Sequence, residues 1–276
     1  MSAIHDDLRG LGQITLVLQG GGALGAYQAG VYEALWESSV EPDWVIGTSI
    51  GAINAALIVG NKRENRCDAL REFWRRVESD SFMGVPLPSW LTVAARNMMT
   101  ITTGIPSFFQ PNPGAFVSMH APLGADNAGY YSVEPLRRSL TELVDFDLIA
   151  KGEMRLTVGA CKVKSSEMIY FDSRETAIGV DHILASGALP PAFPPVRIDG
   201  DLYWDGGIMS NTPVEVVFDD NPRRNGVVFA VHLWNPDGEE PNTIMEVMNR
   251  HKDVQYSSRA STHIHRQRQL HRMRHI

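Results

Sequence analysis

Short apolar runs separated by glycine-rich or polar turns recur along this chain and define its predicted elements. Residues 14–18 and 44–46 are β-branched and other apolar residues, which is typical of buried strands. An Ala/Ile/Leu-rich stretch follows over residues 50–58, and its pattern predicts a helix. The order strand, glycine loop, helix, strand and helix predicts a parallel sheet covered by helices, and therefore an α/β fold.

The remaining elements predicted from the pattern alternate between helices and strands. They are helices over 63–77 and 181–186, a helix with Ser132 as its N-cap, a hairpin of strands over 154–163 and 167–171, a strand ending at Asp205, and a last buried strand over 227–233. The chain has 276 residues, 43% of them hydrophobic, and no internal repeat. We therefore expect one large domain with a full core.

Residues 81–131 depart from this pattern. Prolines interrupt the segment repeatedly, and Phe, Trp and Met residues are spread along it. Loops of this length are usually functional or disordered, and this one is too apolar for disorder. We interpret it as a cap or lid that lines an apolar substrate groove. The alternative is an irregular excursion that packs on the domain without touching substrate.

The junction after the second strand has the spacing Gly47-x-Ser49-x-Gly51. This is the spacing of a nucleophile elbow, where a serine occupies a sharp strand-to-helix turn with a strained backbone. Glycines on both sides prevent clashes at such a turn, and the helix that follows directs unpaired N–H groups at the reacting centre. Ser49 is therefore the candidate nucleophile. A glycine-flanked turn without chemistry is the alternative.

A glycine-rich loop over residues 20–25 follows the first strand. Gly20-x-Gly22-x-x-Gly25 matches the dinucleotide-binding fingerprint. That fingerprint requires an acidic residue at the end of the second strand, whereas the acids Glu41 and Asp43 precede the strand here. Nucleotide binding is therefore disfavoured. A tight turn needed only for helix packing remains an alternative.

We favour an oxyanion hole as the role of this loop. Consecutive glycines let backbone N–H groups approach a ligand closely, and each donor placed where charge develops contributes about 10²–10³ in rate. Gly21 and Gly22 are the first candidates as donors, Gly20 belongs to the same loop, and the N–H of Ile50 after the serine is a further candidate.

A serine hydroxyl requires a base at neutral pH. Asp205 ends a predicted strand, and Gly206 and Gly207 leave its carboxylate unobstructed, so that a partly desolvated Asp205 can take the serine proton directly. His232 completes the chain order Ser49, Asp205, His232 of a triad, but it ends an apolar strand, where a hydrogen-bonded core histidine is expected. An aspartate that caps its own turn is the alternative for Asp205.

Composition excludes several classes of protein. The net charge of -7 does not suit nucleic-acid binding, and Cys67 and Cys161 lack the spacing of a metal site or a disulfide framework. Residues 1–12 are polar and do not resemble a signal peptide. No apolar stretch reaches the roughly 18 residues of a spanning helix. We expect a soluble, cytoplasmic protein.

The C-terminal end has a different character. Residues 244–276 predict a long helix in which apolar residues alternate with Arg, Lys and His. Basic amphipathic helices suit anionic membrane surfaces, which predicts peripheral membrane contact. The alternatives are packing on the domain or on another subunit of a homo-oligomer. The chain stops without a cap or breaker, as expected of a helix that is cut short.

Taken together, the motifs resemble those of the patatin-like phospholipases. The loop at 20–25, the elbow, the stretch Ala185–Pro195 and the triplet Asp205-Gly206-Gly207 follow that family's order and spacing. The resemblance implies a three-layer α/β/α fold with a mostly parallel sheet and a dyad of Ser49 as nucleophile and Asp205 as base. It also implies an oxyanion hole from the glycine loop, with Gly25, Gly47 and Gly51 supporting the motifs, and hydrolysis of lipid acyl esters without a metal or other cofactor.

The resemblance also divides the chain. We expect a tail over 1–13, the hydrolase domain over 14–235 and a basic extension over 236–276. The family often carries Arg or Lys in the glycine loop where this chain has Leu24, which removes a contact for phosphate. Phospholipids, acylglycerols, simpler esters, thioesters and polyesters are therefore open as substrates. A non-catalytic lipid-binding protein that keeps the fold is the rival hypothesis.

Overall fold

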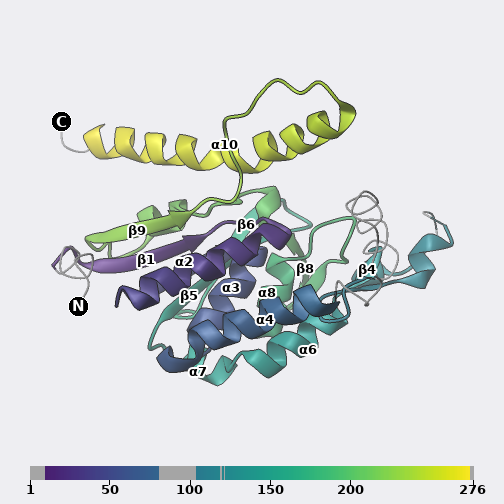
Figure 1. Ribbon diagram of the computed structural model, residues 1–276, viewed down its shortest axis with the longest axis horizontal. Helices are drawn as coiled ribbons and strands as arrows, with labels where there is room; N and C mark the ends of the chain where they lie inside the picture. The colour runs from purple at the N-terminus through teal and green to yellow at the C-terminus, as the bar shows by residue number, and fades with distance from the viewer. Residues whose placement is uncertain (1–9, 81–103, 119, 121, 274–276) are drawn as a thin grey trace.

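A seven-stranded sheet forms the centre of the protein (Figure 1). The computed structural model describes residues 10–80, 104–118, 120 and 122–273. The strands of the sheet are β1 (Gln13–Leu18), β2 (Trp44–Thr48), β5 (Arg155–Lys162), β6 (Glu167–Asp172), β7 (Val196–Ile198), β8 (Asp201–Asp205) and β9 (Gly226–Val231). Their order is β7-β8-β5-β2-β1-β9, with β6 paired to β5. β9, β1, β2 and β5 are mutually parallel, which confirms the predicted α/β fold with a mostly parallel sheet.

The helices are close to their predicted positions. They are α2 (Ala26–Glu37), α3 (Ile50–Val59), α4 (Arg66–Asp80), α6 (Glu134–Leu143), α7 (Phe146–Lys151), α8 (Val180–Ser186), α9 (Glu215–Asp219) and α10 (Ile244–Met273). α7 and α9 are short helices that the pattern did not predict. The prediction that Ser132 is an N-cap was wrong by one residue. Val133 occupies that position, and the Ser132 hydroxyl accepts a hydrogen bond from the N–H of Glu134 (3.3 Å).

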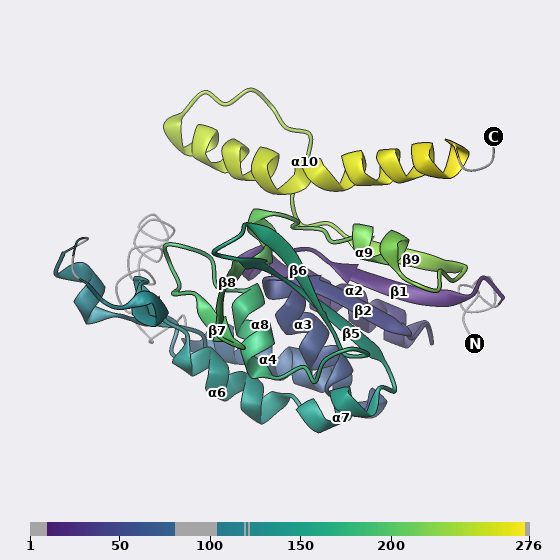
Figure 2. The ribbon, with the colours of Figure 1, turned by 180° about the vertical axis from the view of Figure 1, so that it is seen from behind.

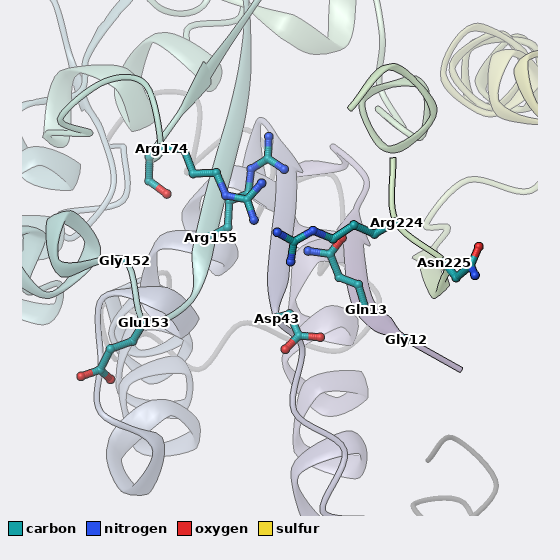
Figure 3. A pocket seen from close by; sticks show the side chains of 10 residues that line it. Gly12, Gln13, Asp43, Gly152, Glu153, Arg155, Arg174, Arg224 and Asn225 are labelled. Carbon is teal, nitrogen blue, oxygen red and sulfur yellow. The ribbon is translucent and has the colours of Figure 1, made fainter. Parts of the chain in front are cut away.

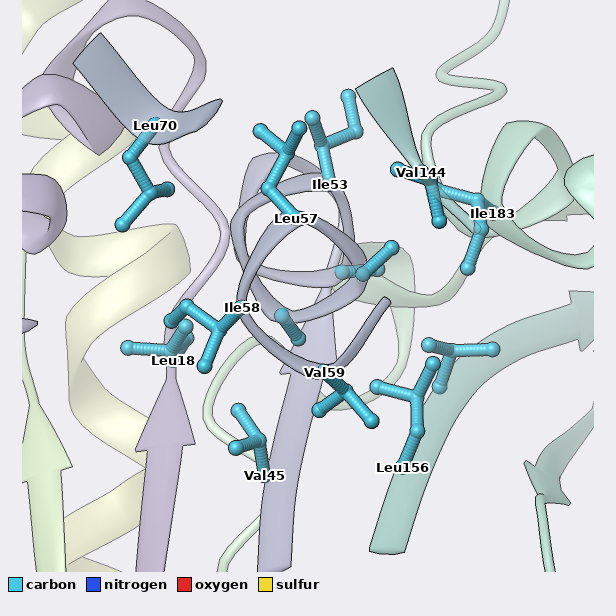
Figure 4. Packing of buried hydrophobic residues seen from close by; sticks show 14 of the residues in the cluster. Leu18, Val45, Ile53, Leu57, Ile58, Val59, Leu70, Val144, Leu156 and Ile183 are labelled. Carbon is cyan, nitrogen blue, oxygen red and sulfur yellow. The ribbon is translucent and has the colours of Figure 1, made fainter. Parts of the chain in front are cut away.

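α3 lies at the centre of the core. All ten of its residues are buried, because small and branched apolar side chains surround the whole helix. Figure 4 shows Leu18, Val45 and Leu156 of the sheet on one side of α3, with Leu70 of α4 and Ile183 of α8 packed around it. The helix that starts at the candidate nucleophile is therefore fixed by core packing on every side.

Successive residues of β1 point to opposite faces of the sheet, as the period of a strand requires. Leu16 and Leu18 join the core cluster around α3, whereas Val17 joins a second cluster with side chains of α9 and with Ile264 of α10. α9 and α10 thus cover one face, and α3, α4, α6 and α8 cover the other (Figures 1 and 2). This arrangement agrees with the expected three layers.

α10 therefore packs on the domain, as one of the alternatives for residues 244–276 proposed. Ser257 is buried, and Ile264 contacts the second cluster. Apolar residues near the start of the helix remain exposed, among them Ile244 (78%) and Met245 (65%). Contact of this helix with an anionic membrane, or with a second subunit, stays a prediction.

Of the predicted cap, residues 81–103, 119 and 121 lie outside the described residues. The described part includes a small antiparallel pair of strands, β3 (Gln110–Pro111) and β4 (Tyr131–Ser132). The aromatic rings of Phe109, Tyr131 and Phe193 pack together with centroid separations of 4.8–6.3 Å. This segment is therefore anchored on the loop that follows α8.

The register of the sheet brings two distant ends of strands together. Along one edge of β5, Gly159 pairs with Thr48, the last residue of β2, and the next residue, Ala160, pairs with Asp205, the last residue of β8. β2 and β8 thus meet end to end on this edge. Ser49 follows Thr48 directly, so the register places it next to Asp205.

Candidate active site

Ser49 has the backbone conformation of a nucleophile elbow. Its φ of 57° and ψ of −126° are rare for a residue with a side chain. Glycine is required on both sides of Ser49, because backbone carbonyl groups lie too close to these positions for a Cβ atom. A Cβ on Gly47 would lie 2.3 Å from the carbonyl oxygen of Gly51, and one on Gly51 would lie 2.1 Å from that of Leu18. The strained turn is thus held between β1 and α3.

Hydrogen bonds from α8 stabilise this turn. The N–H of Ser49 donates to both the carbonyl oxygen (3.1 Å) and the hydroxyl (3.0 Å) of Ser186. The Ser186 hydroxyl in turn donates to the carbonyl oxygen of Gly159 on β5 (2.7 Å). Ser186 is fully buried, so the backbone of the candidate nucleophile is fixed from the sheet and from α8.

Asp205 is the titratable group beside Ser49. It is 2% exposed, and its carboxylate accepts a hydrogen bond from the N–H of Gly207 (2.7 Å). Burial raises the pKa of the Asp205 carboxyl to about 6, and the neighbouring Ser49 side chain and the Gly207 N–H partly oppose that rise. Its turn is capped by its own side chain as well, so the capping role and the contact with Ser49 coexist.

The glycine loop is fixed at both ends by buried side-chain amides. The carbonyl oxygen of Gly20 accepts hydrogen bonds from Asn211 Nδ2 (3.0 Å) and Trp234 Nε1 (2.8 Å). The carbonyl oxygen of Gly25 accepts one from Asn54 Nδ2 (2.9 Å). The N–H of Gly20 donates to the backbone carbonyl of Asn211 (3.1 Å). This bond corrects the expectation that Gly20 is an oxyanion donor, because its N–H already has a partner.

The other three candidate donors are different. In the described part of the chain, the N–H groups of Gly21, Gly22 and Ile50 donate to no backbone carbonyl. Gly21 and Gly22 line a cavity with Ser49, and Gly22 has a φ of 56°, which favours glycine. These groups remain the candidates for an oxyanion hole.

The remaining motif glycines allow close packing around the site. A Cβ would lie 2.4 Å from Ile50 Cγ1 at Gly25, 2.4 Å from the Gly159 carbonyl oxygen at Gly206, and 2.8 Å from Asn211 Oδ1 at Gly207. Larger residues at these positions would displace the serine turn or the support of the glycine loop.

Sequence reasoning missed a network of buried amides beneath the loop. Gln19 Nε2 donates to Thr212 Oγ1 (2.6 Å), and Gln28 Nε2 donates to the carbonyl oxygen of Gln19 (2.7 Å). Asn54 Nδ2 donates to Gln28 Oε1 (2.9 Å). All three amide side chains are buried, and buried polar groups require such partners. The available signal was an asparagine in the middle of the otherwise apolar α3.

An apolar cavity of about 320 Å³ opens on one side of Ser49. Its wall includes Ile53 of α3, Trp74 and Val77 of α4, Leu136 of α6 and Leu184 of α8, with Ile105, Phe108, Phe109 and Phe193 from loops. Ile105, Phe108 and Phe109 belong to the predicted cap, so the described part of that segment contributes to an apolar pocket. A lid function for the segment stays a prediction.

A second, more polar cavity of about 380 Å³ also contains Ser49 and Asp205. Its lining includes Gly20, Gly21, Gly22, Gly207, Asn211 and Trp234 and, from α10, His251, Lys252, Gln255 and Tyr256. Burial raises the pKa of the Tyr256 phenol, and the charge of Asp205 adds to that rise. α10 therefore closes one side of the candidate site.

His232 is not part of this site. It follows β9, is exposed, and lines neither of the two cavities at Ser49. The expectation of a core histidine at this position was therefore wrong. The exposure follows from the position of β9 at the edge of the sheet, where the strand is only partly covered.

A further cleft, of about 610 Å³, lies at the opposite end of the sheet from Ser49, at the N-terminal ends of the parallel strands (Figure 3). Gln13, Asp43, Arg155, Arg174 and Arg224 line it. The Arg155 guanidinium is already engaged, because it forms 2.8 Å ion pairs with two aspartates of neighbouring segments. In parallel α/β sheets ligands bind at the carboxyl ends of the strands, which is where Ser49 lies.

Among the described residues, no group of three or more His, Cys, Asp or Glu side chains is arranged to hold a metal ion. No helix in the same residues combines the length and the apolar character needed to cross a membrane.

Comparison with known proteins agrees with the motifs. The family model described as patatin-like phospholipase matches residues 16–218, which include Ser49 and Asp205. An uncharacterized NTE family protein of Mycobacterium tuberculosis is 29% identical over 219 residues, 79% of this chain and 30% of that protein. A lysophospholipase NTE1 of Cryptococcus neoformans is 26% identical, over 83% of this chain and 12% of that protein. This chain thus spans less than a third of the length of these relatives.

Two further similarities are to a mouse protein and to a solved structure. Patatin-like phospholipase domain-containing protein 7 of Mus musculus is 26% identical over 81% of this chain and 14% of its own length. The crystal structure of VipD from Legionella pneumophila aligns with a TM-score of 0.40 and 18% identity, covering 75% of this chain and 48% of VipD. Because the family model matches most of the chain, and the glycine loop, elbow and acidic triplet all lie inside the match, the chain belongs to the patatin-like phospholipase family.

Proposed function

We propose that this chain is a serine hydrolase that cleaves the acyl esters of lipids. The observation that carries the proposal is the position of Ser49 beside the buried Asp205 carboxylate, at the point where an apolar and a polar cavity meet. Membership of the patatin-like phospholipase family supports it. So does the lysophospholipase activity named for one relative, although this chain covers 12% of that protein.

The proposed reaction begins with acyl transfer to Ser49. Asp205 takes the hydroxyl proton as Ser49 Oγ attacks the ester carbonyl carbon, which becomes tetrahedral and places a negative charge on its oxygen. The N–H groups of Gly21 and Gly22, with that of Ile50, stabilise this oxyanion. Asp205 then returns the proton to the alcohol oxygen as the C–O bond breaks, and an acyl-enzyme remains.

Deacylation repeats the same steps with water. Asp205 takes a proton from a water molecule, whose oxygen attacks the acyl carbon on Ser49. Collapse of the second tetrahedral intermediate breaks the bond to Ser49 Oγ, which recovers its proton from Asp205, and the fatty acid leaves. A carboxyl with a pKa of about 6 is suited to both directions of transfer, because the best acid–base groups titrate near the working pH.

The apolar cavity is the proposed acyl site. Its wall consists of branched aliphatic and aromatic side chains, so burial of an acyl chain there is favourable by about 0.8 kcal/mol for each methylene removed from water. Acylglycerols, phospholipids, thioesters and polyesters all present an acyl chain to such a site. The cavity therefore supports the acyl part of the proposal for each of them.

A fluorophosphonate probe tests the proposal. We expect the probe to label the wild-type protein and not Ser49→Ala, and we expect the unlabelled wild type, but not Ser49→Ala, to hydrolyse p-nitrophenyl esters. Absence of both labelling and hydrolysis in a folded wild-type protein, in solution and with micelles, would favour a non-catalytic lipid-binding protein. Equal labelling of Ser49→Ala would place the nucleophile elsewhere.

A further inference from the structure

The polar cavity has one wall that comes from outside the family match. His251, Lys252, Gln255 and Tyr256 of α10 line it, and these residues follow the matched range 16–218. The position of α10 over the cavity is fixed by several contacts. The Tyr256 ring lies 5.3 Å from that of Trp234, and the Tyr256 carbonyl oxygen accepts hydrogen bonds from two buried amides beneath the glycine loop (3.2 and 3.3 Å).

The charges around this cavity favour an anion. Lys252 forms no ion pair with any carboxylate among the described residues. The nearest acid in the sequence, Asp253, lies 4.0 Å from Arg250 instead. The acid in the described lining is Asp205, which is buried at the inner end beside Ser49, whereas Lys252 is exposed at the outer side. An anionic group that enters from solvent therefore meets an uncompensated ammonium.

An ester bound at Ser49 must place its two halves on different sides of the carbonyl carbon. The apolar cavity accepts the acyl chain, because its wall carries few polar groups. The alcohol half then extends into the polar cavity, where amide, imidazole, phenol and ammonium groups lie. At about 380 Å³ this cavity has the size of a small-molecule site.

We infer that the polar cavity binds the alcohol half of the ester and selects alcohols that carry a phosphate, with Lys252 of α10 contacting the phosphate. This inference rests on the proposed acyl hydrolase function. It accounts for Leu24, an exposed residue of the glycine loop that offers phosphate no cation. The cation comes instead from a helix that follows the hydrolase domain, and Lys252 is a specificity residue rather than part of the catalytic machinery.

Two substrates with the same acyl chain test the inference. We would compare 1-octanoyl-glycerol 3-phosphate with 1-octanoyl-glycerol, both as monomers, in the wild type, Lys252→Ala and Lys252→Glu. Arg266→Ala is the matched control, because it removes one positive charge from an exposed position of α10 that does not line the cavity. We expect Lys252→Ala to raise KM for the phosphate ester about fivefold, as for a partly exposed ion pair, and Lys252→Glu to raise it further. The neutral ester and the control should change less than about twofold.

Inhibition identifies the source of the phosphate. Glycerol 3-phosphate should inhibit hydrolysis of the neutral ester competitively in the wild type and more weakly in Lys252→Ala. Inorganic phosphate should inhibit less than glycerol 3-phosphate. Equal inhibition by both would overturn the inference, because it would show a site for free phosphate rather than for an esterified alcohol.

The remaining outcomes separate this inference from the proposed function. If Ser49-dependent hydrolysis of the neutral ester is intact and Lys252→Ala leaves KM for the phosphate ester unchanged, the inference is wrong and the proposed function stands. If Arg266→Ala has the same effect as Lys252→Ala, the effect comes from the overall positive charge of α10 and not from a contact of Lys252 with the phosphate, and the inference is wrong. If the wild type hydrolyses neither ester, the proposed function itself fails.

Discussion

The two cavities that meet at Ser49 have different origins. The apolar cavity is built by α3, α4, α6 and α8 and by loops between them, all inside the range that the family model matches. The polar cavity is completed by α10, which begins after that range. One half of the site is thus part of the core, and the other half depends on an added helix.

This difference has a consequence for how each half can change. Side chains such as Ile53 and Leu184 line the apolar cavity and are also buried core residues, so a change of their volume alters both substrate fit and stability. Lys252 is exposed and belongs to no core cluster, so a change there can alter the substrate without disturbing the fold. With the proposed assignment of the two cavities, we expect selectivity for the alcohol to vary more readily than selectivity for the acyl chain.

The largest effect is expected from Ser49, which lines both cavities. Ser49→Ala should lower kcat/KM at least about 10⁴-fold for every ester, whatever its acyl chain or alcohol, because loss of the nucleophile removes both half-reactions. The melting temperature should change by no more than a few degrees, since α3 remains packed. Ser165→Ala, in the exposed turn between β5 and β6, is the control. A loss confined to one class of ester would show two separate sites instead of one.

Asp205→Asn should lower kcat about 10³-fold or more. In the wild type, kcat/KM should fall about tenfold for each pH unit below about 6, because the protonated carboxyl cannot accept the serine proton. Above that pH it should level off. Asp201→Asn, on the same strand, should retain both the rate and the inflection. A wild-type profile without an inflection near pH 6 would argue against Asp205 as the base.

Asp205→Asn should also change how the free energy of unfolding depends on pH. The pKa of Asp205 is raised in the folded protein from 3.8 to about 6, so the folded state binds this proton more tightly than the unfolded chain does. The contribution of this group to the free energy of unfolding is therefore largest below about pH 4 and is lost as the pH rises to about 6. Asp205→Asn should lack that loss, which denaturant titrations at several pH values would detect.

A smaller effect is expected from a substitution that narrows the apolar cavity alone. Val77→Trp adds volume to the wall of the apolar cavity from α4. Displacing about two methylenes of an acyl chain into water should lower kcat/KM for long-chain p-nitrophenyl esters about tenfold and leave the butyrate unchanged. Val117→Trp, at a position that is 83% exposed, is the control. An equal loss for short and long chains would show that the acyl chain does not occupy this cavity.

The smallest effect concerns the polar cavity. Raising the ionic strength to about 0.5 M should lower kcat/KM for a phosphate ester about twofold to threefold, because salt screens an exposed ammonium. The neutral ester with the same acyl chain should be unaffected. A decrease of the same size for both esters would mean that salt acts on the enzyme in general rather than on the alcohol half.

Much of the fold could be predicted because its signals are local. The strand at 14–18, the elbow and the buried helix after it each follow from apolar runs and glycine spacing over a few residues. Ser49 and Asp205 could be named from the same kind of signal. Their proximity could not, because it depends on β8 pairing with β5 directly beyond the end of β2, a register set by the whole sheet.

The parts that were missed depend on long-range contacts. The N–H of Gly20 looked as free as that of Gly21, and only the fold brings the carbonyl of Asn211 to it. The role of α10 was missed for a related reason. Its composition indicates a basic amphipathic helix, but the contact of Tyr256 with Trp234 that holds it over the site joins residues on separate elements. Composition therefore suggested contact of this helix with a membrane surface, and it did not indicate that its side chains line the cavity.

Trapping the acyl-enzyme tests the central claim most directly. The protein would be mixed with excess p-nitrophenyl octanoate, quenched in acid during the first turnovers, digested and analysed by mass spectrometry. The account predicts an octanoyl group on the peptide that contains Ser49, at its hydroxyl, and no adduct in Ser49→Ala. Steady turnover without an acyl group on Ser49, or an adduct at another residue that forms at the rate of turnover, would contradict it.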